Sequence, residues 1–306
     1  MPVLETQLDV HSDEFRQNAA TMQALVDEFR SIEQKVIAKA EEMLPKFRKR
    51  NQLLPRERVE RMLDPNSPYF ELMSLAGYKM HDNKDGSEAG GGVIAGIGYV
   101  QGIRCLIVAN NSAIKGGTIS PAGLHKTLRL QEIIRQNRLP IITLSESGGA
   151  NLNYAGEIFV EGARTFANQA RLSAAGIPQI TVVHGNATAG GAYQPGLSDY
   201  VIVVRNRAKM FLAGPPLLFA ATGEIATDEA LGGAELHASI AGTAEYLAES
   251  DADGIRLARE IMAKIPWNDQ CQWPTPKAFQ PPRYDAEELL GIVPNDPKKP
   301  YDCREI

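Results

Sequence analysis

The sequence predicts an α/β protein in which a sheet is covered by helices. Strand-like and helix-like segments alternate from about residue 78 onward. The strand-like segments are rich in Val and Ile without a regular polar–apolar alternation, as expected of a sheet buried on both faces. Two of these segments end in a pair of glycines shortly before a helix-like segment, in SESGGAN and NATAGGAY.

Composition and charge limit the possible classes of protein. The 306 residues include 43% hydrophobic and 23% charged side chains and carry a net charge of -5. Such a chain fits one large domain or two modest ones and has no global attraction for nucleic acid. The cysteines lack CxxC spacing, which argues against a disulfide framework and a structural zinc site. They are Cys105, Cys271 and Cys303.

The first ten residues, MPVLETQLDV, lack the basic and apolar regions of a signal peptide. In addition, no apolar run of the sequence reaches the roughly 18 residues of a membrane span. We therefore expect no membrane partner. The expected location is the cytoplasm of a bacterium or, in a eukaryote, the mitochondrial matrix.

The N-terminal segment, residues 1–55, is expected to be helical. Apolar residues recur at steps of three and four from Met22 to Phe47, which is the spacing of one face of a long helix. The basic cluster KFRKRN follows where that helix should end, and is interpreted as a solvated helix end. Prolines in LPRERVERMLDPNSPYF then separate a short helix and a turn from the main body.

The main body, residues 56–272, is expected to contain the sheet. Residues 90–111 have the pattern of two strands joined by a turn at Gln101-Gly102. The next expected elements are a helix over 121–138, a strand over 141–145, a helix over about 155–175, and strands in QITVVHG, DYVIVVRN and KMFLAG. The tail, residues 273–306, is rich in Pro and is expected to wrap or link.

The two glycine-rich junctions are the candidate catalytic elements. Unpaired N–H groups at a helix start attract an oxygen that carries negative charge, and glycine leaves no side chain in the way. Two facing junctions would form an oxyanion hole, in which each donor lowers a barrier by about 2.7 to 4 kcal/mol. Taken singly, each GGA is better explained as a tight turn, but their placement after two strands favours a ligand site. The predicted catalytic residues are Gly148, Gly149, Ala150, Gly190 and Gly191.

Long blocks of the sequence occur in a fixed order and include VANNSAIKGGT, ESGGANL, GNATAGGAY and FLAGPPLLFAATGE. From about Leu54 to the end, the chain resembles the carboxyltransferase (β) subunits of biotin-dependent acyl-CoA carboxylases. The pattern is closest to methylcrotonoyl-CoA and geranyl-CoA carboxylase β subunits. The resemblance implies a crotonase-like fold of ββα units stacked into a superhelix, with acyl-CoA bound over the sheet.

The resemblance also implies a function for the glycine segments. The chain would bind acyl-CoA and stabilise the enolate of its thioester while a carboxyl group is transferred from N1-carboxybiotin. Gly190 and Gly191 would supply one oxyanion donor, and Gly149 or Ala150 the other. The residues expected to contact the substrate or its CoA are Lys115, Gly116, Gly117, Asn151, Ala189, Ala192 and Tyr193. For Lys115, exposure to solvent without a ligand is nearly as plausible.

The resemblance places biotin on another chain, because the sequence has no Met-Lys-Met biotinylation motif and no GxxxxGK[ST] loop. The implied partners are an α subunit with biotin carboxylase and biotin carrier domains, and further β subunits, as a hexamer for the full-length family member. No metal is expected. Family subunits continue into a second half, so residues 273–306 are expected to be a linker toward an absent C-terminal half.

Other interpretations remain open. Glu146 is a candidate acid or base, although a role as acceptor for local backbone N–H groups is favoured. His184 and His237 are expected to be structural, because neither has metal-ligand spacing to another His. An acyl-CoA hydratase, isomerase or thioesterase of the same fold would need a polar side chain beside the oxyanion hole. A decarboxylase would run similar chemistry backwards. A non-catalytic assembly domain would use the N-terminal helix to dock partners.

Overall fold

The computed structural model describes residues 5–270, 278 and 281–306, and Cys271 lies outside these described residues. The chain divides into two compact units. The larger unit is Val36–Gln272, and the smaller unit combines Met1–Lys35 with Trp273–Ile306. The expected boundary at residue 55 falls inside the larger unit. The division into residues 1–55, 56–272 and 273–306 therefore stays a prediction.

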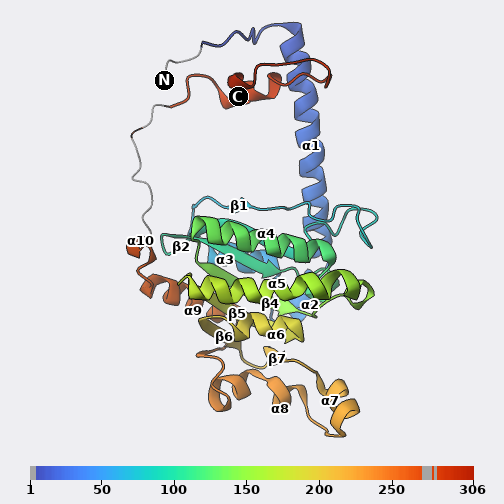
Figure 1. Ribbon diagram of the computed structural model, residues 1–306, viewed down its shortest axis with the longest axis vertical. Helices are drawn as coiled ribbons and strands as arrows, with labels where there is room; N and C mark the ends of the chain where they lie inside the picture. Colours follow the sequence, from blue (N-terminus) through green and yellow to red (C-terminus); the bar gives the residue numbers. More distant parts are fainter. Residues whose placement is uncertain (1–4, 271–277, 279–280) are drawn as a thin grey trace. The chain divides into compact units, whose positions relative to one another are not determined.

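The larger unit is built on one mixed sheet (Figure 1). Its strands lie in the order β1-β2-β3-β4-β5-β6-β8, and β7 pairs with the end of β5. The first three strands are antiparallel, and the pairs from β3 to β8 are parallel. The strands are β1 (Phe70–Glu71), β2 (Val93–Val100), β3 (Ile103–Asn110), β4 (Ile141–Ser147), β5 (Gln179–Thr188), β6 (Tyr200–Val204), β7 (Lys209–Phe211) and β8 (Tyr246–Ala248). The α/β class is confirmed.

The parallel strands are apolar and buried along most of their length, which explains the absence of polar alternation in their sequences. The predicted hairpin turn between β2 and β3 is also confirmed. Gln101 and Gly102 have φ values of 54° and 71°. A two-residue turn of type I′ requires positive φ at both positions, and its twist matches that of the strands.

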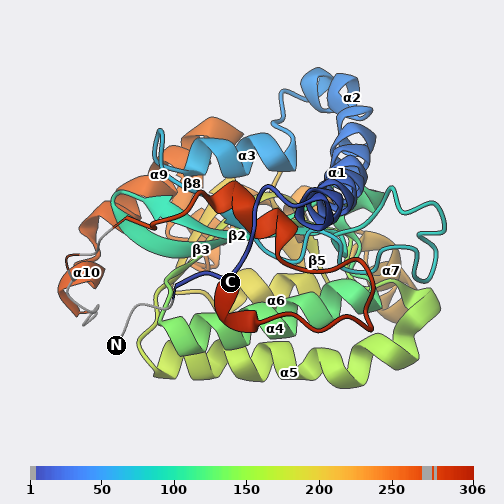
Figure 2. The same ribbon diagram turned by 90° about the horizontal axis from the view of Figure 1, so that it is seen from above.

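Helices cover both faces of the sheet (Figure 2). α4 (Pro121–Asn137) and α5 (Ala155–Ala174) lie side by side on one face, and α3 (Pro55–Met62) and α9 (Asp251–Lys264) cover the other. Ser120 caps the start of α4, because its side chain accepts the N–H of Gly123. The shorter elements include the 3₁₀ helices η1 (Lys115–Gly117) and η2 (Leu152–Tyr154), and the helices α6 (Gly190–Gly196), α7 (Pro215–Thr222), α8 (Asp228–Gly232) and α10 (Trp267–Gln270).

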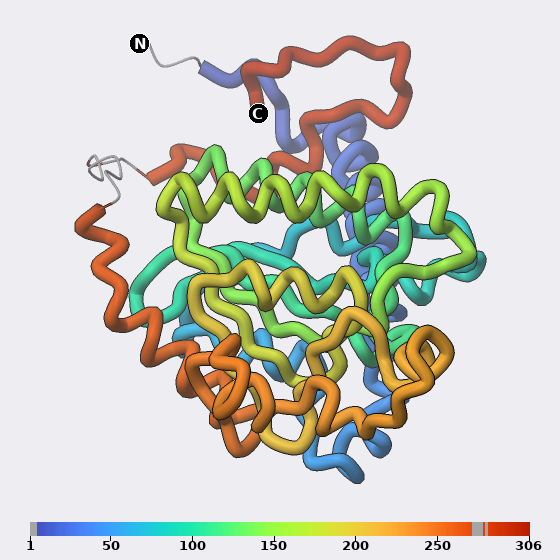
Figure 3. Tube along the Cα trace, turned by 60° about the horizontal axis from the view of Figure 1, so that its bottom comes forward, coloured from blue at the N-terminus to red at the C-terminus, as the bar shows by residue number. Residues whose placement is uncertain are grey.

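After β7 the chain continues into the short helices α7 and α8, drawn in orange in Figure 3. None of the residues of α7 is buried. Leu217 and Phe219 are 60% and 56% exposed, so this segment presents apolar side chains at the surface. Within the described residues, no helix is long and apolar enough to cross a membrane.

The expected single helix through residue 47 is wrong. α1 (Asp13–Glu41) stops before α2 (Leu44–Lys49), which has Pro45 in its first turn. Proline lacks the N–H of a continuing helix and clashes with the preceding turn, so one helix cannot run through this position. The apolar stripe is also buried unevenly. Val36 packs in a core cluster of the larger unit, whereas Phe29 is 44% exposed.

In the smaller unit, the proline-rich tail packs on the first turns of α1. The side chain of Asn18 donates to the carbonyl oxygen of Gly291 over 3.3 Å, and Lys299 forms an ion pair with Glu14 over 3.0 Å. The tail contains the 3₁₀ helices η4 (Ala286–Gly291) and η5 (Cys303–Glu305). It therefore wraps onto the helix, which is one of the two roles predicted for it.

Lys126 is a buried cation on α4. Its side chain is 2% exposed, and its ammonium group donates to the carbonyl oxygens of Met73 (3.2 Å), Gly90 (3.3 Å) and Val93 (2.6 Å). These bonds tie the loop before β2 to the helix. Burial lowers the pKa of Lys126 to about 8, because the desolvated ammonium ion is less stable than in water.

Between about pH 8 and 10.5, we expect the free energy of unfolding of the parent protein to rise relative to that of the variant Lys126→Met. In this window the unfolded chain binds more protons than the folded chain, since the folded-state pKa is the lower one. Losing the proton therefore favours the folded state, by roughly 3 kcal/mol over the whole window. Urea unfolding of both proteins at several pH values measures the difference, and parallel pH profiles would contradict it.

Candidate functional site

The two glycine segments lie side by side at the ends of adjacent parallel strands. β4 leads into the first segment and β5 into the second, and their register pairs Ser147 with Ala187. A Cβ atom built on Gly149 would lie 3.5 Å from the carbonyl oxygen of Thr188, and one built on Gly191 would lie 3.7 Å from the Cβ of Ser147. A single added side-chain atom would thus bring the two segments into van der Waals contact.

The N–H groups of the first segment differ in their partners. Gly148 donates to the carbonyl oxygen of Gly116 over 3.1 Å, and Gly149 donates to the hydroxyl of Ser147 over 3.1 Å. Among the described residues we find no acceptor for the N–H of Ala150. Ala150 is therefore the candidate donor of this segment, whereas the N–H groups of the two glycines already donate hydrogen bonds within the protein.

The second segment begins with an unusual backbone conformation. Ala189 has φ 50° and ψ -123°, which costs a residue other than glycine about 1 to 3 kcal/mol. Its N–H donates to the carbonyl oxygen of Phe211 over 3.0 Å. Gly190 and Gly191 follow as the first residues of α6, so their N–H groups have no acceptor within the helix. We find none in the rest of the described chain. The N–H of Ala192 donates to the carbonyl oxygen of Ala189 over 3.0 Å.

Two of the predicted CoA contacts line a cavity. Lys115 and Asn151 form part of its wall together with His81, Glu88 and Tyr154. The ammonium group of Lys115 is already ion-paired with the carboxylate of Glu88. The residues predicted to be catalytic do not contribute to this wall. The structure thus separates the predicted set into a glycine pair at the strand ends and a cavity beside it.

The remaining predicted residues have identifiable structural surroundings. Gly117 packs closely on β4, because a Cβ atom at this position would lie 2.3 Å from the carbonyl oxygen of Glu146. Gly116 has open space around its Cα. Tyr193 is 46% exposed, and its ring centroid lies 5.0 Å from that of Phe166.

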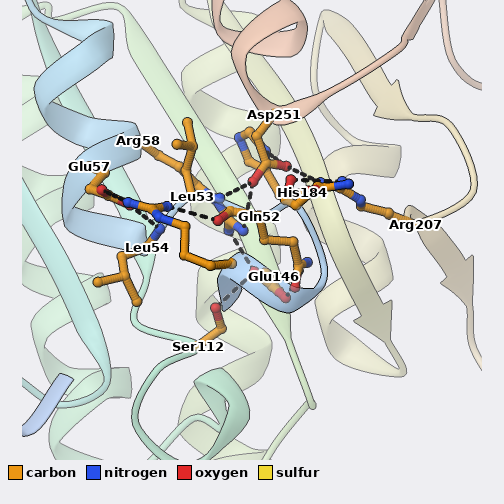
Figure 4. Close-up of polar contacts among 12 residues, drawn as sticks. Gln52, Leu53, Leu54, Glu57, Arg58, Ser112, Glu146, His184, Arg207 and Asp251 are labelled. Carbon is orange, nitrogen blue, oxygen red and sulfur yellow. Dashed lines mark hydrogen bonds and ion pairs between the residues drawn. The ribbon is translucent and has the colours of Figure 1, made fainter. Parts of the chain in front are cut away.

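A buried network of charged side chains lies next to the strand ends (Figure 4). Arg58 on α3 is fully buried, and its guanidinium lies 2.6 Å from Glu146 and 3.3 Å from Asp251. Asp251 also contacts the Nδ1 atom of His184 at 3.0 Å and a guanidinium nitrogen of Arg207 at 3.3 Å. The network therefore links α3, β4, β5 and α9.

The titration of this network follows from its burial. Burial, together with the nearby positive charge of Arg58, lowers the pKa of His184 and keeps the imidazole neutral. A neutral ring that donates from Nδ1 leaves Nε2 as a buried acceptor, and this atom has no partner among the described residues. Burial alone would raise the pKa of Asp251, but its contacts with His184, Arg58 and the N–H of Leu53 lower it well below its usual value.

Three side chains singled out from the sequence can now be placed. The carboxylate of Glu146 accepts from the side chains of Arg58, Ser112 and Gln52, so the favoured role as acceptor for backbone N–H groups is wrong. His184 and His237 are both held by contacts within the protein, and their structural role stays a prediction. The ring nitrogens of His237 lie 2.6 Å from the Thr243 hydroxyl and 2.8 Å from a carbonyl oxygen.

Arg58 and Asp251 were missed because no local motif marks them. Each lies in an ordinary charged segment, Arg58 in PRERVERM and Asp251 in DADGIRLAREIMAK. Their pairing joins residues far apart in the sequence. Within the described part of the chain, no group of His, Cys, Asp and Glu is arranged to hold a metal ion.

Comparisons with known proteins agree with this architecture. The family model described as the carboxyl transferase domain matches residues 46–306. The chain belongs to the carboxyl transferase domain family. The sequence resemblance is thus confirmed.

Two curated relatives cover nearly the whole of this carboxyl transferase chain. A probable biotin-dependent acyl-coenzyme A carboxylase beta2 subunit of Mycobacterium tuberculosis is 46% identical, over 99% of this chain and 56% of the relative. A probable mitochondrial methylcrotonoyl-CoA carboxylase beta chain of Drosophila melanogaster is 41% identical, again over 99% of this chain and 56% of the relative. The chain thus spans about half the length of the curated relatives it matches.

Solved structures confirm the crotonase-like fold of the carboxyl transferase domain. The crystal structure of the P. aeruginosa geranyl-CoA carboxylase beta subunit aligns with a TM-score of 0.91 and 65% identity, over 99% of this chain and 56% of that chain. The transcarboxylase 12S structure, described as a hexamer assembly with hydrolysed methylmalonyl-coenzyme A bound, aligns with a TM-score of 0.71 and 26% identity, over 93% of this chain and 56% of that chain.

The loop before the first glycine segment provides a stability test with a matched control. We expect Gly117→Ala to lower the free energy of unfolding more than Gly116→Ala. Both positions have positive φ, 70° and 63°, which alone costs an alanine about 1 to 2 kcal/mol. Gly117→Ala adds a clash with the carbonyl oxygen of Glu146, whereas the Cβ atom of Gly116→Ala meets no atom within 4 Å in the described part of the chain. Urea unfolding measures both variants, and equal losses would contradict the close packing.

Proposed function

We propose that this carboxyl transferase domain binds an acyl-CoA and stabilises the enolate of its thioester while the enolate carbon accepts a carboxyl group. One observation carries the proposal. Among the described residues, the N–H groups of Ala150, Gly190 and Gly191 lack acceptors, and they belong to two segments that lie side by side at the ends of adjacent strands. Ala189 and Gly190 are exposed, so a ligand can reach the second segment.

The chemistry follows from where charge develops. When the acyl group loses a proton from the carbon activated by the thioester, the electron pair moves onto the thioester oxygen. N–H groups held in place stabilise that oxygen by about 2.7 to 4 kcal/mol each, without reorganising during the reaction. Biotin carried on a partner chain would supply the carboxyl group and accept the proton. The role of this chain is to bind and orient the thioester, and its donor set of neutral amides fits an oxyanion.

The proposed substrate is a short or branched acyl-CoA of the methylcrotonoyl-CoA type. The names of the relatives support this class. Lys115, Gly116, Gly117 and Asn151 are proposed to contact the CoA part, and Ala189, Ala192 and Tyr193 the acyl side. For a CoA phosphate to bind Lys115, it would have to replace the carboxylate of Glu88, which holds the ammonium group in the free protein.

The proposed partners are a biotin carboxylase and carrier (α) subunit and further copies of the β subunit, in a hexamer. The exposed apolar side chains of α7 support a contact with another chain, since clustered apolar surface marks interaction sites. The proposed location is the cytoplasm of a bacterium or the mitochondrial matrix of a eukaryote.

A hydratase of the same fold has less support from the site, whereas a decarboxylase would use the proposed oxyanion hole in the reverse reaction. A hydratase needs an acid or base beside the oxyanion hole. Glu146 is the carboxylate nearest in sequence to the first glycine segment. Its side chain lies on the face of β4 opposite to the side chain of Ser147, where Arg58 binds it. A hydration assay with crotonyl-CoA tests this function directly. Hydration is measured as the loss of absorbance of the conjugated thioester. Isothermal titration with CoA thioesters tests the non-catalytic assembly role, which absence of binding would favour.

We expect Gly191→Val to reduce enolisation of 3-methylcrotonoyl-CoA by about 10²-fold or more, the usual cost of losing one oxyanion donor. The methyl groups of valine would extend from a Cβ position 3.7 Å from Ser147 into the space between the two segments. Exchange of the acidic C–H hydrogens in D₂O, with the buffer as base, is measured by mass spectrometry.

Gly196→Ala is the matched control for Gly191→Val. It lies on the same helix, and its added Cβ atom would meet no atom of the described residues within 4 Å. Circular dichroism establishes that both variants are folded. Unchanged exchange in folded Gly191→Val would count against the proposed oxyanion hole.

A further inference from the structure

The main-chain ladder between β4 and β5 is interrupted directly before the glycine segments. Regular pairing ends at Ser145 and Val183 and resumes at Ser147 and Ala187. One residue of β4, Glu146, therefore faces three residues of β5, numbers 184–186. Such an irregularity leaves backbone groups without ladder partners and bends the strand. Other interactions must fix the two strand ends there.

Side chains replace the ladder at this point. On β4, the N–H of Glu146 donates to the side chain of Asn110 over 3.2 Å, and the hydroxyl of Ser112 donates to its carboxylate over 2.8 Å. Gly185 leaves the room for this carboxylate, because a Cβ atom there would lie 2.7 Å from the Oε1 atom of Glu146. On β5, His184 is fully buried and held by Asp251 over 3.0 Å.

Arg58 joins the two sides of the interruption. One terminal nitrogen of its guanidinium lies 2.6 Å from Glu146 on β4, and the other lies 3.3 Å from Asp251, the partner of His184 on β5. The side chain is fully buried, so water does not screen these charges. The contact with Glu146 is a directed hydrogen bond, whereas the contact with Asp251 is an ion pair without a hydrogen bond. The planar guanidinium presents its two terminal nitrogens to the two carboxylates at once, which a point charge on a flexible chain does not.

We propose that Arg58 is a positioning residue, which through Glu146 and Asp251 sets the separation between the N–H of Ala150 and those of Gly190 and Gly191. This inference rests on the proposed function. Ala150 lies four residues after Glu146, and Gly190 lies six residues after His184. Movement of either strand end therefore shifts one donor group relative to the other. Arg58 itself acts from the α3 face of the sheet, through its two carboxylate partners.

The test uses Glu146→Gln, which keeps the shape of the side chain but removes its charge from the contact with Arg58. Asp251→Asn makes the same change on the β5 side. Glu132→Gln is the matched control, because it removes a carboxylate from an exposed ion pair with Arg135. Each protein is titrated calorimetrically with crotonyl-CoA labelled with ¹³C at the thioester carbon. The carbonyl stretching frequency of the bound ligand is then measured by isotope-edited infrared difference spectroscopy.

The infrared frequency reports the alignment of the donors on bound ligand alone, so a loss of global stability does not change it. We expect the parent protein and Glu132→Gln to lower the carbonyl frequency of bound crotonyl-CoA relative to that of the free ligand. Glu146→Gln and Asp251→Asn should lose at least about half of this shift, because hydrogen bonds weaken steeply with misalignment. Their dissociation constants should stay within about threefold of the parent value, a difference below 1 kcal/mol.

Full-sized shifts in folded Glu146→Gln and Asp251→Asn would overturn the positioning role of Arg58. If either variant does not fold, Arg58→Lys decides by the same criterion, since it keeps the positive charge but loses the planar group that reaches both carboxylates. A parent protein that binds crotonyl-CoA without any carbonyl shift would instead refute the proposed oxyanion hole. The two failures are thus distinguishable.

Discussion

The guanidinium of Arg58 lies between two carboxylates, 2.6 Å from Glu146 and 3.3 Å from Asp251, and is shielded from water. Taking three charges out of water is costly, and removing one partner of such a set leaves an uncompensated buried charge. α3, β4 and α9 are therefore held in one arrangement, and the neutral ring of His184 adds β5 to it. The glycine segments follow directly from the strand ends that this network fixes.

The candidate chemistry depends on backbone amides, whose direction is set by the course of the chain. A parallel pair of strands ends at one edge of the sheet, which places the two segments side by side. The hydroxyl of Ser147 accepts the N–H of Gly149 and donates to the carbonyl oxygen of Gly117. The strained turn at Ala189 then directs the chain into α6. Side chains and close packing thus supply the rigidity that an oxyanion hole requires.

The elements of the sheet unit were predictable because their signals are local. The hairpin at Gln101-Gly102 and the helix that starts at Pro121 depend on turn and cap residues within a few positions. The single helix through residue 47 was wrong, since its apolar periodicity masked the effect of Pro45. The role of Glu146 was misjudged because its partners Arg58 and Gln52 lie 88 and 94 residues away in the sequence.

By itself, the sequence determined the α/β class, the two glycine segments and the resemblance to the carboxyl transferase family. These conclusions rest on local patterns and on ordered blocks of residues. The tertiary structure decided that the N–H of Ala150 has no acceptor in the described part of the chain whereas those of Gly148 and Gly149 do, and that Lys115 is paired with Glu88. It also decided that Arg58 links both strand ends. Hydrogen bonds and ion pairs of this kind depend on distances between residues that only folding brings together.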